Sequence, residues 1–207
     1  WAPTRWYPTA AADSGTGAAK QAVLDGANMV LAAGGDGTVR GVAEVLRGSG
    51  IPLAVVPLGT GNLLARNIGM PLGDIDEAVR AAFQGANRPI DLGVITITRE
   101  DESESEHVFL VLAGMGLDAR TISTTSSSLK KRLGWLAYVD AGVRTMLKDA
   151  PLEIQYSFDG SPAMSLSVYT VMIGNCGLMP GGVLLIPDAK FDDGYLDVVA
   201  LNPLGAF

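Results

Sequence analysis

The stretch "MVLAAGGDGTVRGVAEVL", from Met29 to Leu46, places three glycines and one aspartate between two regular patterns. Residues 29–33 form a short continuous apolar run, which is typical of a buried parallel strand. From Val39 onward, apolar residues recur at intervals of three and four, as on one face of an amphipathic helix. The stretch therefore predicts a strand, a tight glycine-rich turn and a helix.

The turn itself has an unusual composition. Gly34, Gly35 and Gly37 let a ligand approach the backbone closely, and the free N–H groups that open the next helix bind anions. Asp36 would repel a phosphate, unless it meets a metal ion or takes a proton from a reacting hydroxyl. The same residues also suit a plain tight turn with Asp36 near the helix N-cap. On this stretch alone, both interpretations stay open.

A second stretch, "IPLAVVPLGTGNLLARNIGMP" from Ile51 to Pro71, repeats the arrangement. An apolar strand over residues 53–56 ends in a glycine-rich loop, and a helical pattern follows. In an open α/β sheet, loops at the carboxyl ends of parallel strands gather at one edge, where ligands bind. Thr60 and Asn62 add neutral hydrogen-bond donors that suit phosphate oxygens.

Taken together, GGDGT (34–38) and P-L-G-T-G-N-x-x-A-R-N (57–67) resemble the diacylglycerol kinase catalytic family, which includes bacterial lipid kinases and the sphingosine and ceramide kinases. GGDGT also occurs in NAD kinases, whereas the second motif is the lipid-kinase one. Three further segments agree with the family pattern: RPIDLGVI (88–95), LAGMGLDA (112–119) and IGNCGLMPGGVLLIPDAKFDDGYLDVVAL (173–201). The resemblance therefore spans nearly the whole chain.

Composition fits this class. The chain has 207 residues, 48% of them hydrophobic, which is enough for one large or two small cores. A net charge of −7 argues against a nucleic-acid partner. The single cysteine, Cys176, excludes an intrachain disulfide and fits a reducing cytoplasm. With one histidine and one cysteine, zinc sites and histidine-based triads have little support.

The expected fold is α/β. Residues 1–87 alternate strand and helix, which predicts a nucleotide-binding domain with a parallel sheet, and the resemblance implies one of the NAD-kinase and phosphofructokinase type. Residues 88–207 read mainly as strands, and the resemblance implies a sandwich-like lipid-substrate domain. We expect the chain to be incomplete at both ends, because family members begin with an earlier strand and continue through a D-G-E segment. That segment carries the usual proton acceptor of bacterial members.

The resemblance implies phosphoryl transfer from ATP to a lipid hydroxyl, with Mg²⁺, and most simply from ATP to diacylglycerol to give phosphatidic acid. The implied catalytic residues are Asp36, in a magnesium or proton-handling role, and Asp91, in the same acidic network. Asp91 could instead be a turn residue at a strand end. The residues expected to line the nucleotide phosphates, on or beside the two glycine loops, are Thr9, Gly34, Gly35, Asp36, Gly37, Thr38, Val39, Arg40, Gly59, Thr60, Gly61 and Asn62.

A second, structural Mg²⁺ site is implied at "DAKFDDGYLD", residues 188–197. The matching positions are Asp193 for the carboxylate, with Lys190 and Tyr195 providing main-chain oxygens. One carboxylate, carbonyl oxygens and water are suitable ligands for a hard cation. Asp193 could equally serve only to cap its own turn.

Two departures from the family pattern affect the substrate assignment. The family often has N-E-V after GGDGT, where this chain has Arg40, Gly41 and Val42. Leu63 stands where bacterial members often have an aspartate, so one candidate metal ligand is missing. The resulting G-N-L-L is closer to the sphingosine-kinase form. The acceptor could therefore be a sphingosine- or ceramide-type lipid.

The remaining expectations concern location and partners. A basic and apolar segment, "SSSLKKRLGWLAY" (126–138), could dock on an anionic membrane or simply run from a solvated loop into a packed helix. We expect a cytoplasmic protein at the inner face of the membrane, with a lipid substrate presented there and with homo-oligomers left open. The alternatives are a soluble NAD-kinase-like enzyme and a nucleotide- or lipid-binding module without catalysis.

Overall fold

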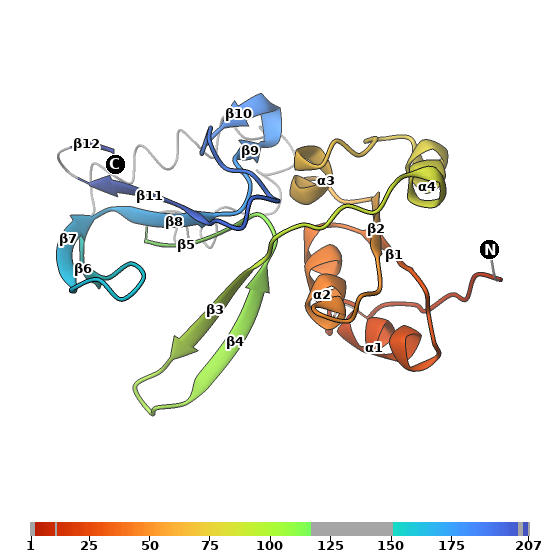
Figure 1. Ribbon diagram of the computed structural model, residues 1–207, viewed down its shortest axis with the longest axis horizontal. Helices are drawn as coiled ribbons and strands as arrows, with labels where there is room; N and C mark the ends of the chain where they lie inside the picture. Colours follow the sequence, from red (N-terminus) through yellow and green to blue (C-terminus); the bar gives the residue numbers. More distant parts are fainter. Residues whose placement is uncertain (1–2, 11, 117–150, 203–204, 207) are drawn as a thin grey trace. The chain divides into compact units, whose positions relative to one another are not determined.

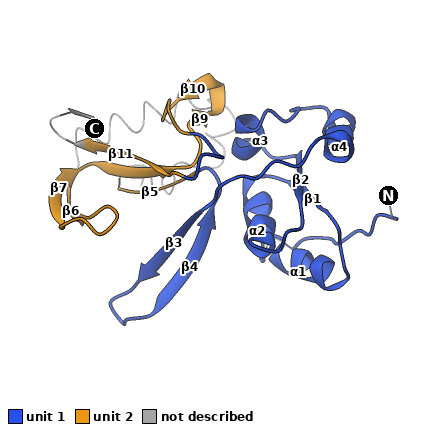
Figure 2. Ribbon diagram, viewed as in Figure 1, with its two compact units in different colours: residues 1–111, 190–194 blue, residues 112–189, 195–207 orange. Residues whose placement is uncertain are grey.

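The computed structural model describes residues 3–10, 12–116, 151–202 and 205–206. The chain groups into two compact units (Figure 2). Unit 1 contains Trp1–Val111 and Lys190–Gly194, and unit 2 contains Leu112–Ala189 and Tyr195–Phe207. Residues 117–119 of the LAGMGLDA motif and the basic segment 126–138 lie outside the described residues.

Unit 1 is built around two parallel strands, β1 (Val30–Gly34) and β2 (Leu53–Pro57). Their register pairs Val30 with Leu53 and Gly34 with Pro57, so both strands end at the same edge of the sheet. Each strand is then followed directly by a glycine-rich loop and a helix. The predicted parallel α/β arrangement is therefore confirmed, and it brings the two loops to one edge (Figure 1).

Four helices complete the α/β part of unit 1: α1 (Thr16–Leu24), α2 (Asp36–Leu46), α3 (Leu63–Asn67) and α4 (Ile75–Gln84). Helix α2 packs on both strands, α1 packs on α2, and α4 packs on β2. The stripe predicted from the spacing of apolar residues is the buried face of α2, and it consists of Val39, Val42, Ala43 and Leu46. Burial of this face against the sheet is the main source of stability for such a helix.

A hairpin of strands β3 (Gly93–Thr98) and β4 (Glu104–Phe109) also belongs to unit 1. A Cβ atom at Gly93 would overlap the ring of Phe109, the residue paired with it, so a larger residue at the base of the hairpin would force that ring to move. Arg47, just after α2, donates to Glu106 at 2.7 Å and ties β4 to the helix. The division that we predicted after residue 87 would place this hairpin in the second domain. That division stays a prediction.

The described residues of unit 2 are mainly β, as predicted. Its largest sheet is antiparallel and has the order β12 (Gly205–Ala206), β11 (Asp197–Asn202), β8 (Thr170–Gly174) and β5 (Leu112–Gly116). Two short pairs accompany it: β6 (Leu152–Tyr156) with β7 (Met164–Val168), and β9 (Leu178–Met179) with β10 (Val183–Leu184), joined by the 3-10 turn η1 (Pro180–Gly182). Buried Val168, Met172 and Cys176 belong to its core.

Among the described residues, no helix combines the length and the apolar character that crossing a membrane requires.

Candidate active site

The two glycine loops of unit 1 touch each other through their backbones. Gly35 is the N-cap of α2, and a Cβ atom placed on Gly59 would lie only 2.6 Å from the Cα of Gly35. The first residue after β2 continues the sheet pairing, because the Leu58 N–H donates to the Gly34 carbonyl at 3.0 Å. A side chain at Gly59 would push the two loops apart, so this contact requires glycine there.

Asp36, the first residue of α2, is held by the second loop. Its Oδ1 accepts a hydrogen bond from the Leu63 N–H at 2.5 Å. Its Oδ2 lies over Gly61, where an added Cβ would approach it to 2.7 Å. Gly35 is the N-cap of α2 and Asp36 follows it directly, so the structure also agrees with the plain-turn alternative, which places Asp36 near the helix N-cap. The carboxylate also joins the two loops.

The second loop is fixed by side chains. Asn62 has left-handed backbone angles (φ 48°, ψ 48°) and is only 9% exposed. Its Nδ2 donates to the Gly59 carbonyl at 2.8 Å, and its Oδ1 accepts from the Gly59 N–H at 2.9 Å. Arg66 adds a bond from Nε to the Gly61 carbonyl at 2.7 Å. Thr60, by contrast, is exposed at the tip of the loop, where its hydroxyl can meet a ligand.

Thr9 lies beside Gly15, in the turn before α1. A Cβ atom on Gly15 would lie 3.1 Å from Thr9 Cγ2 and 3.5 Å from Thr38 Cγ2, so the two threonines border the same glycine. Gly15 has a φ of +88° and caps α1. Its N–H donates to Asp13 Oδ1 at 2.8 Å, which fixes the turn that carries it. Nucleotide binding by Thr9 and Thr38 stays a prediction, and their position beside Gly15 supports it.

The same turn explains Gly41, where the chain departs from the family pattern. A Cβ atom on Gly41 would lie 2.6 Å from the carbonyl oxygen of Ser14. Ser14 itself has a φ of +51°. The turn before α1 therefore packs directly on the backbone of α2. Sequence inspection marked Gly41 as unusual but gave no partner for it.

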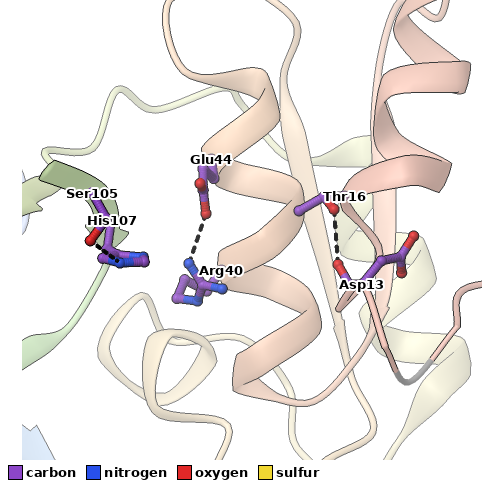
Figure 3. A network of polar contacts seen from close by, with 6 residues as sticks. All are labelled: Asp13, Thr16, Arg40, Glu44, Ser105 and His107. Carbon is purple, nitrogen blue, oxygen red and sulfur yellow. Dashed lines mark hydrogen bonds and ion pairs between the residues drawn. The ribbon is translucent and has the colours of Figure 1, made fainter. Parts of the chain in front are cut away.

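Two further residues of the predicted phosphate-binding set, Val39 and Arg40, have side chains that are buried or already bonded. Val39 is buried at 4% exposure, so only its backbone is available to a ligand. The Arg40 guanidinium donates from Nη1 to Glu44 Oε2 at 2.7 Å, one turn along the same helix (Figure 3). Both side chains of this pair are more than a third exposed, so the ion pair adds little stability. Arg40 could exchange Glu44 for a phosphate, and its assignment stays a prediction.

A hollow of about 670 Å³ in unit 1 reaches the loops. At the loop end, its lining includes Thr9, Gly15, Thr38 and Leu58. The predicted nucleotide-binding threonines therefore face open space and are not sealed in the core.

Asp91 is anchored to the segment 190–194. Its Oδ2 accepts from the Gly194 N–H at 2.7 Å, and its own N–H donates to the Phe191 carbonyl at 2.7 Å. Nearby, Arg88 donates from Nε to Asp192 Oδ2 at 2.9 Å, and its guanidinium lies 4.6 Å from the centre of the Phe191 ring. The side chain and the backbone N–H of Asp91 thus hold the turn at residues 190–194 in place. Its membership of an acidic network with Asp36 remains a proposal.

The predicted structural Mg²⁺ site lies at this turn. Gly194 has a φ of +81°, which confirms a tight turn directly after Asp193. Among the described residues, no group of three or more His, Cys, Asp or Glu side chains could hold a metal ion. A site formed by one carboxylate of Asp193 and the main-chain oxygens of Lys190 and Tyr195 does not require such a group. It remains a proposal.

Thiol chemistry can be set aside. Cys176 is 1% exposed, and burial raises the pKa of its thiol to about 12. The side chain is therefore protonated at neutral pH, and a protonated thiol is a poor nucleophile.

Comparison with known proteins identifies the family of the chain. Residues 3–95 match the family model described as the diacylglycerol kinase catalytic domain. Residues 111–206 match the YegS C-terminal NAD kinase beta sandwich-like domain. A diacylglycerol kinase of Bacillus subtilis (strain 168) is 32% identical over 202 residues, which cover 96% of this chain and 63% of that protein. A probable YegS-like lipid kinase of Pseudomonas aeruginosa (strain UCBPP-PA14) is 36% identical over 186 residues, covering 88% and 57%.

Solved structures give the same result. The crystal structure of a diacylglycerol kinase from Bacillus anthracis str. Sterne superposes with a TM-score of 0.73 at 26% identity, covering 95% of this chain and 63% of that one. This chain thus spans about three fifths of the length of the relatives it matches. The two family models account for nearly all of the chain, and the first contains both glycine loops. The chain therefore belongs to the family of diacylglycerol and YegS-like lipid kinases, with a diacylglycerol kinase catalytic domain followed by a YegS-type β sandwich-like domain.

Proposed function

We propose that the full-length protein transfers the γ-phosphate of ATP to a lipid hydroxyl, with diacylglycerol as the acceptor and phosphatidic acid as the product. The observation that supports this most directly is the position of Asp36. Its carboxylate lies where two backbone-lined glycine loops meet, and a main-chain N–H of the second loop fixes one of its oxygens. A plain turn does not need that bond.

In this proposal, the first loop and the start of α2 hold the phosphates of ATP. The backbone N–H groups of residues 35–38 are the natural donors, because a helix N-terminus favours negative charge. The exposed hydroxyl of Thr60 and the threonines beside Gly15 add neutral donors around them. Such fixed donors stabilise charge that develops on the transferred group, without reorganising during the reaction.

Asp36 gives the site its one carboxylate at the loop junction. Mg²⁺, when bound with ATP, neutralises charge on the phosphates, and the donor set fits it because this ion takes one or two carboxylates together with phosphate and water oxygens. The acceptor oxygen forms the new bond to the γ-phosphorus, and the bond from that phosphorus to the ADP oxygen breaks. Asp36 would either receive the hydroxyl proton itself or help to hold the metal ion, in which case the proton would pass to water. The Leu63 N–H keeps its carboxylate facing the junction in both cases.

The acceptor and the location follow from the lipid chemistry. A diacylglycerol remains in a bilayer, so the enzyme must work at a membrane surface, and a peripheral enzyme at the inner face of a cytoplasmic membrane meets both ATP and its lipid. The relatives named as diacylglycerol kinases support this acceptor. Leu63, in place of an acidic residue, keeps a sphingoid base or ceramide as the second candidate.

The test is a radiolabelled-ATP assay of the full-length protein on vesicles that contain diacylglycerol, sphingosine or ceramide, with soluble NAD⁺ as a further acceptor. We expect labelled phosphatidic acid, and less product from the other acceptors. Phosphorylation of NAD⁺ without vesicles would replace the proposal with a soluble kinase. ATP binding without turnover on any acceptor would leave a binding module.

A further inference from the structure

The side chain of Asn62 forms its hydrogen bonds within its own loop. Both polar atoms of its amide bond to one residue, Gly59, through the carbonyl and the N–H of that residue. This pair of bonds fixes the orientation of the amide, because the flipped group would place like against like at both ends. A phosphate could gain the Nδ2 donor only by displacing the Gly59 carbonyl from it.

The backbone at Asn62 determines where the next N–H points. Left-handed angles are uncommon outside glycine, and asparagine tolerates them better than most residues. The chain then turns directly into α3, so the peptide between Asn62 and Leu63 projects its N–H out of the loop. That N–H is the one that donates to Asp36 Oδ1.

The loop leaves no room for side chains at two of its glycines. The positions of Cβ atoms at Gly61 and Gly59 would meet Asp36 Oδ2 at 2.7 Å and Gly35 Cα at 2.6 Å. If the loop moved, the carboxylate or the first glycine loop would have to move with it. The position of Asp36 therefore depends on the shape of a loop that begins 23 residues later in the sequence, counted from residue 36 to residue 59.

We propose that Asn62 is a positioning residue, which locks the second glycine loop so that the Leu63 N–H holds the Asp36 carboxylate in its productive orientation. It does not act as a ligand of the nucleotide. This inference rests on the proposed function, since it gives the reason why Asp36 can serve phosphoryl transfer. On this proposal, asparagine is present at position 62 because of the geometry of the loop and not because it recognises phosphate.

Two substitutions in the full-length protein isolate the lock. Asn62→Gly removes both side-chain bonds and still accepts a φ of +48°, and Asn62→Ala removes them and also strains the backbone. The matched control is Ser49→Ala. Ser49 also makes one donated and one accepted bond to backbone, with the Leu46 carbonyl at 2.7 Å and the Ile51 N–H at 3.1 Å, and it lies in the turn before β2, at the opposite end of that strand.

We expect Asn62→Gly to lower kcat at least about tenfold, and to change the Kd for ATP, measured by calorimetry, by less than about threefold. Asn62→Ala should lower kcat more than Asn62→Gly does. Ser49→Ala should keep the kcat of the wild-type protein at a temperature where both are folded. Amide hydrogen exchange at Leu63 should accelerate at least about tenfold in Asn62→Gly and stay unchanged in Ser49→Ala.

Two results would overturn the proposal. A Kd for ATP that weakens in proportion to the loss of activity would make Asn62 a nucleotide ligand. Unchanged kcat and unchanged exchange at Leu63 in Asn62→Gly would show that the lock has no effect on Asp36. A wild-type protein without turnover would instead reject the kinase proposal, and the exchange measurement would still decide whether Asn62 fixes the Leu63 N–H.

Discussion

The two glycine loops of unit 1 have similar sequences and similar places in the fold, yet they are held in different ways. Among the described residues, neither loop has a side-chain cap at its helix N-terminus, and no side-chain bond to the backbone of residues 34–37 is found. The second loop is fixed by Asn62 and by Arg66, and its glycines are the ones that touch Asp36 and Gly35.

This difference indicates that the two loops have different roles. A loop that must hold a ligand keeps its N–H groups available, because each one already used internally is lost to phosphate. A loop that must hold a protein group can satisfy its backbone with side chains and become rigid. We therefore interpret the first loop as the phosphate cradle and the second as the support for Asp36.

The largest effect is expected at the carboxylate that joins the two loops. Asp36→Asn keeps the size of the side chain and removes its charge, so we expect kinase activity of the full-length protein to be lost while the fold remains. The measurement is kcat with diacylglycerol vesicles, alongside thermal unfolding. If the variant keeps more than about a tenth of wild-type kcat, a loss below ~1.4 kcal/mol, Asp36 is a turn residue only.

The contact between the loops can be broken at Gly59. Gly59→Ala puts a Cβ atom 2.6 Å from Gly35 Cα, so we expect a loss of about 1–3 kcal/mol in the free energy of unfolding, together with lower activity. The control is Gly37→Ala in the first turn of α2, where an added Cβ meets nothing within 4 Å. Alanine there should stabilise the helix by about 0.5–1 kcal/mol in denaturant unfolding. Equal stability of the two variants would contradict a tight contact at Gly59.

A smaller effect is expected at Gly41, which packs against the turn before α1. Gly41→Ala must displace the Ser14 carbonyl, which would shift the turn that places Gly15 between Thr9 and Thr38. We expect the KM for ATP to rise about threefold to tenfold with a smaller change in kcat, because only nucleotide contacts are disturbed. Val45→Ala, a half-buried position on the same helix, is the control for lost stability alone. A fall in kcat at constant KM would show that this turn does not position nucleotide ligands.

The effect expected to matter least for activity concerns a third turn, at residues 190–195, which extends the comparison to a loop that a metal would hold. Crystals of the full-length protein soaked in Mn²⁺ should show an anomalous peak near Asp193. Mg²⁺ at about a hundred times its Kd should stabilise the fold by about 2.7 kcal/mol, seen as a rise in Tm. Asp193→Ala should lose that rise, and Asp36→Asn should keep it. Without a peak near Asp193, that side chain only caps its turn.

Much of unit 1 could be predicted from the sequence because its signals are local. The apolar run over residues 29–33 and the spacing from Val39 to Leu46 are properties of short windows, and they correctly predicted β1 and the buried face of α2. The glycine motifs marked both loops for the same reason. The mainly β character of unit 2 also followed from alternation along its strands, although its strand order did not.

The partners within the candidate site were decided by the tertiary structure. The bond from the Leu63 N–H to Asp36 joins residues 27 positions apart, and the bond from the Gly194 N–H to Asp91 joins residues 103 positions apart. Neither pair follows from residue type, because an N–H is present at almost every position and only the register of β1 with β2, or the return of the chain at 190–194, brings the right one close. The sequence by itself thus determined which residues could do the chemistry. The packing of segments distant in the sequence decided which backbone groups hold them, since those positions depend on many contacts at once.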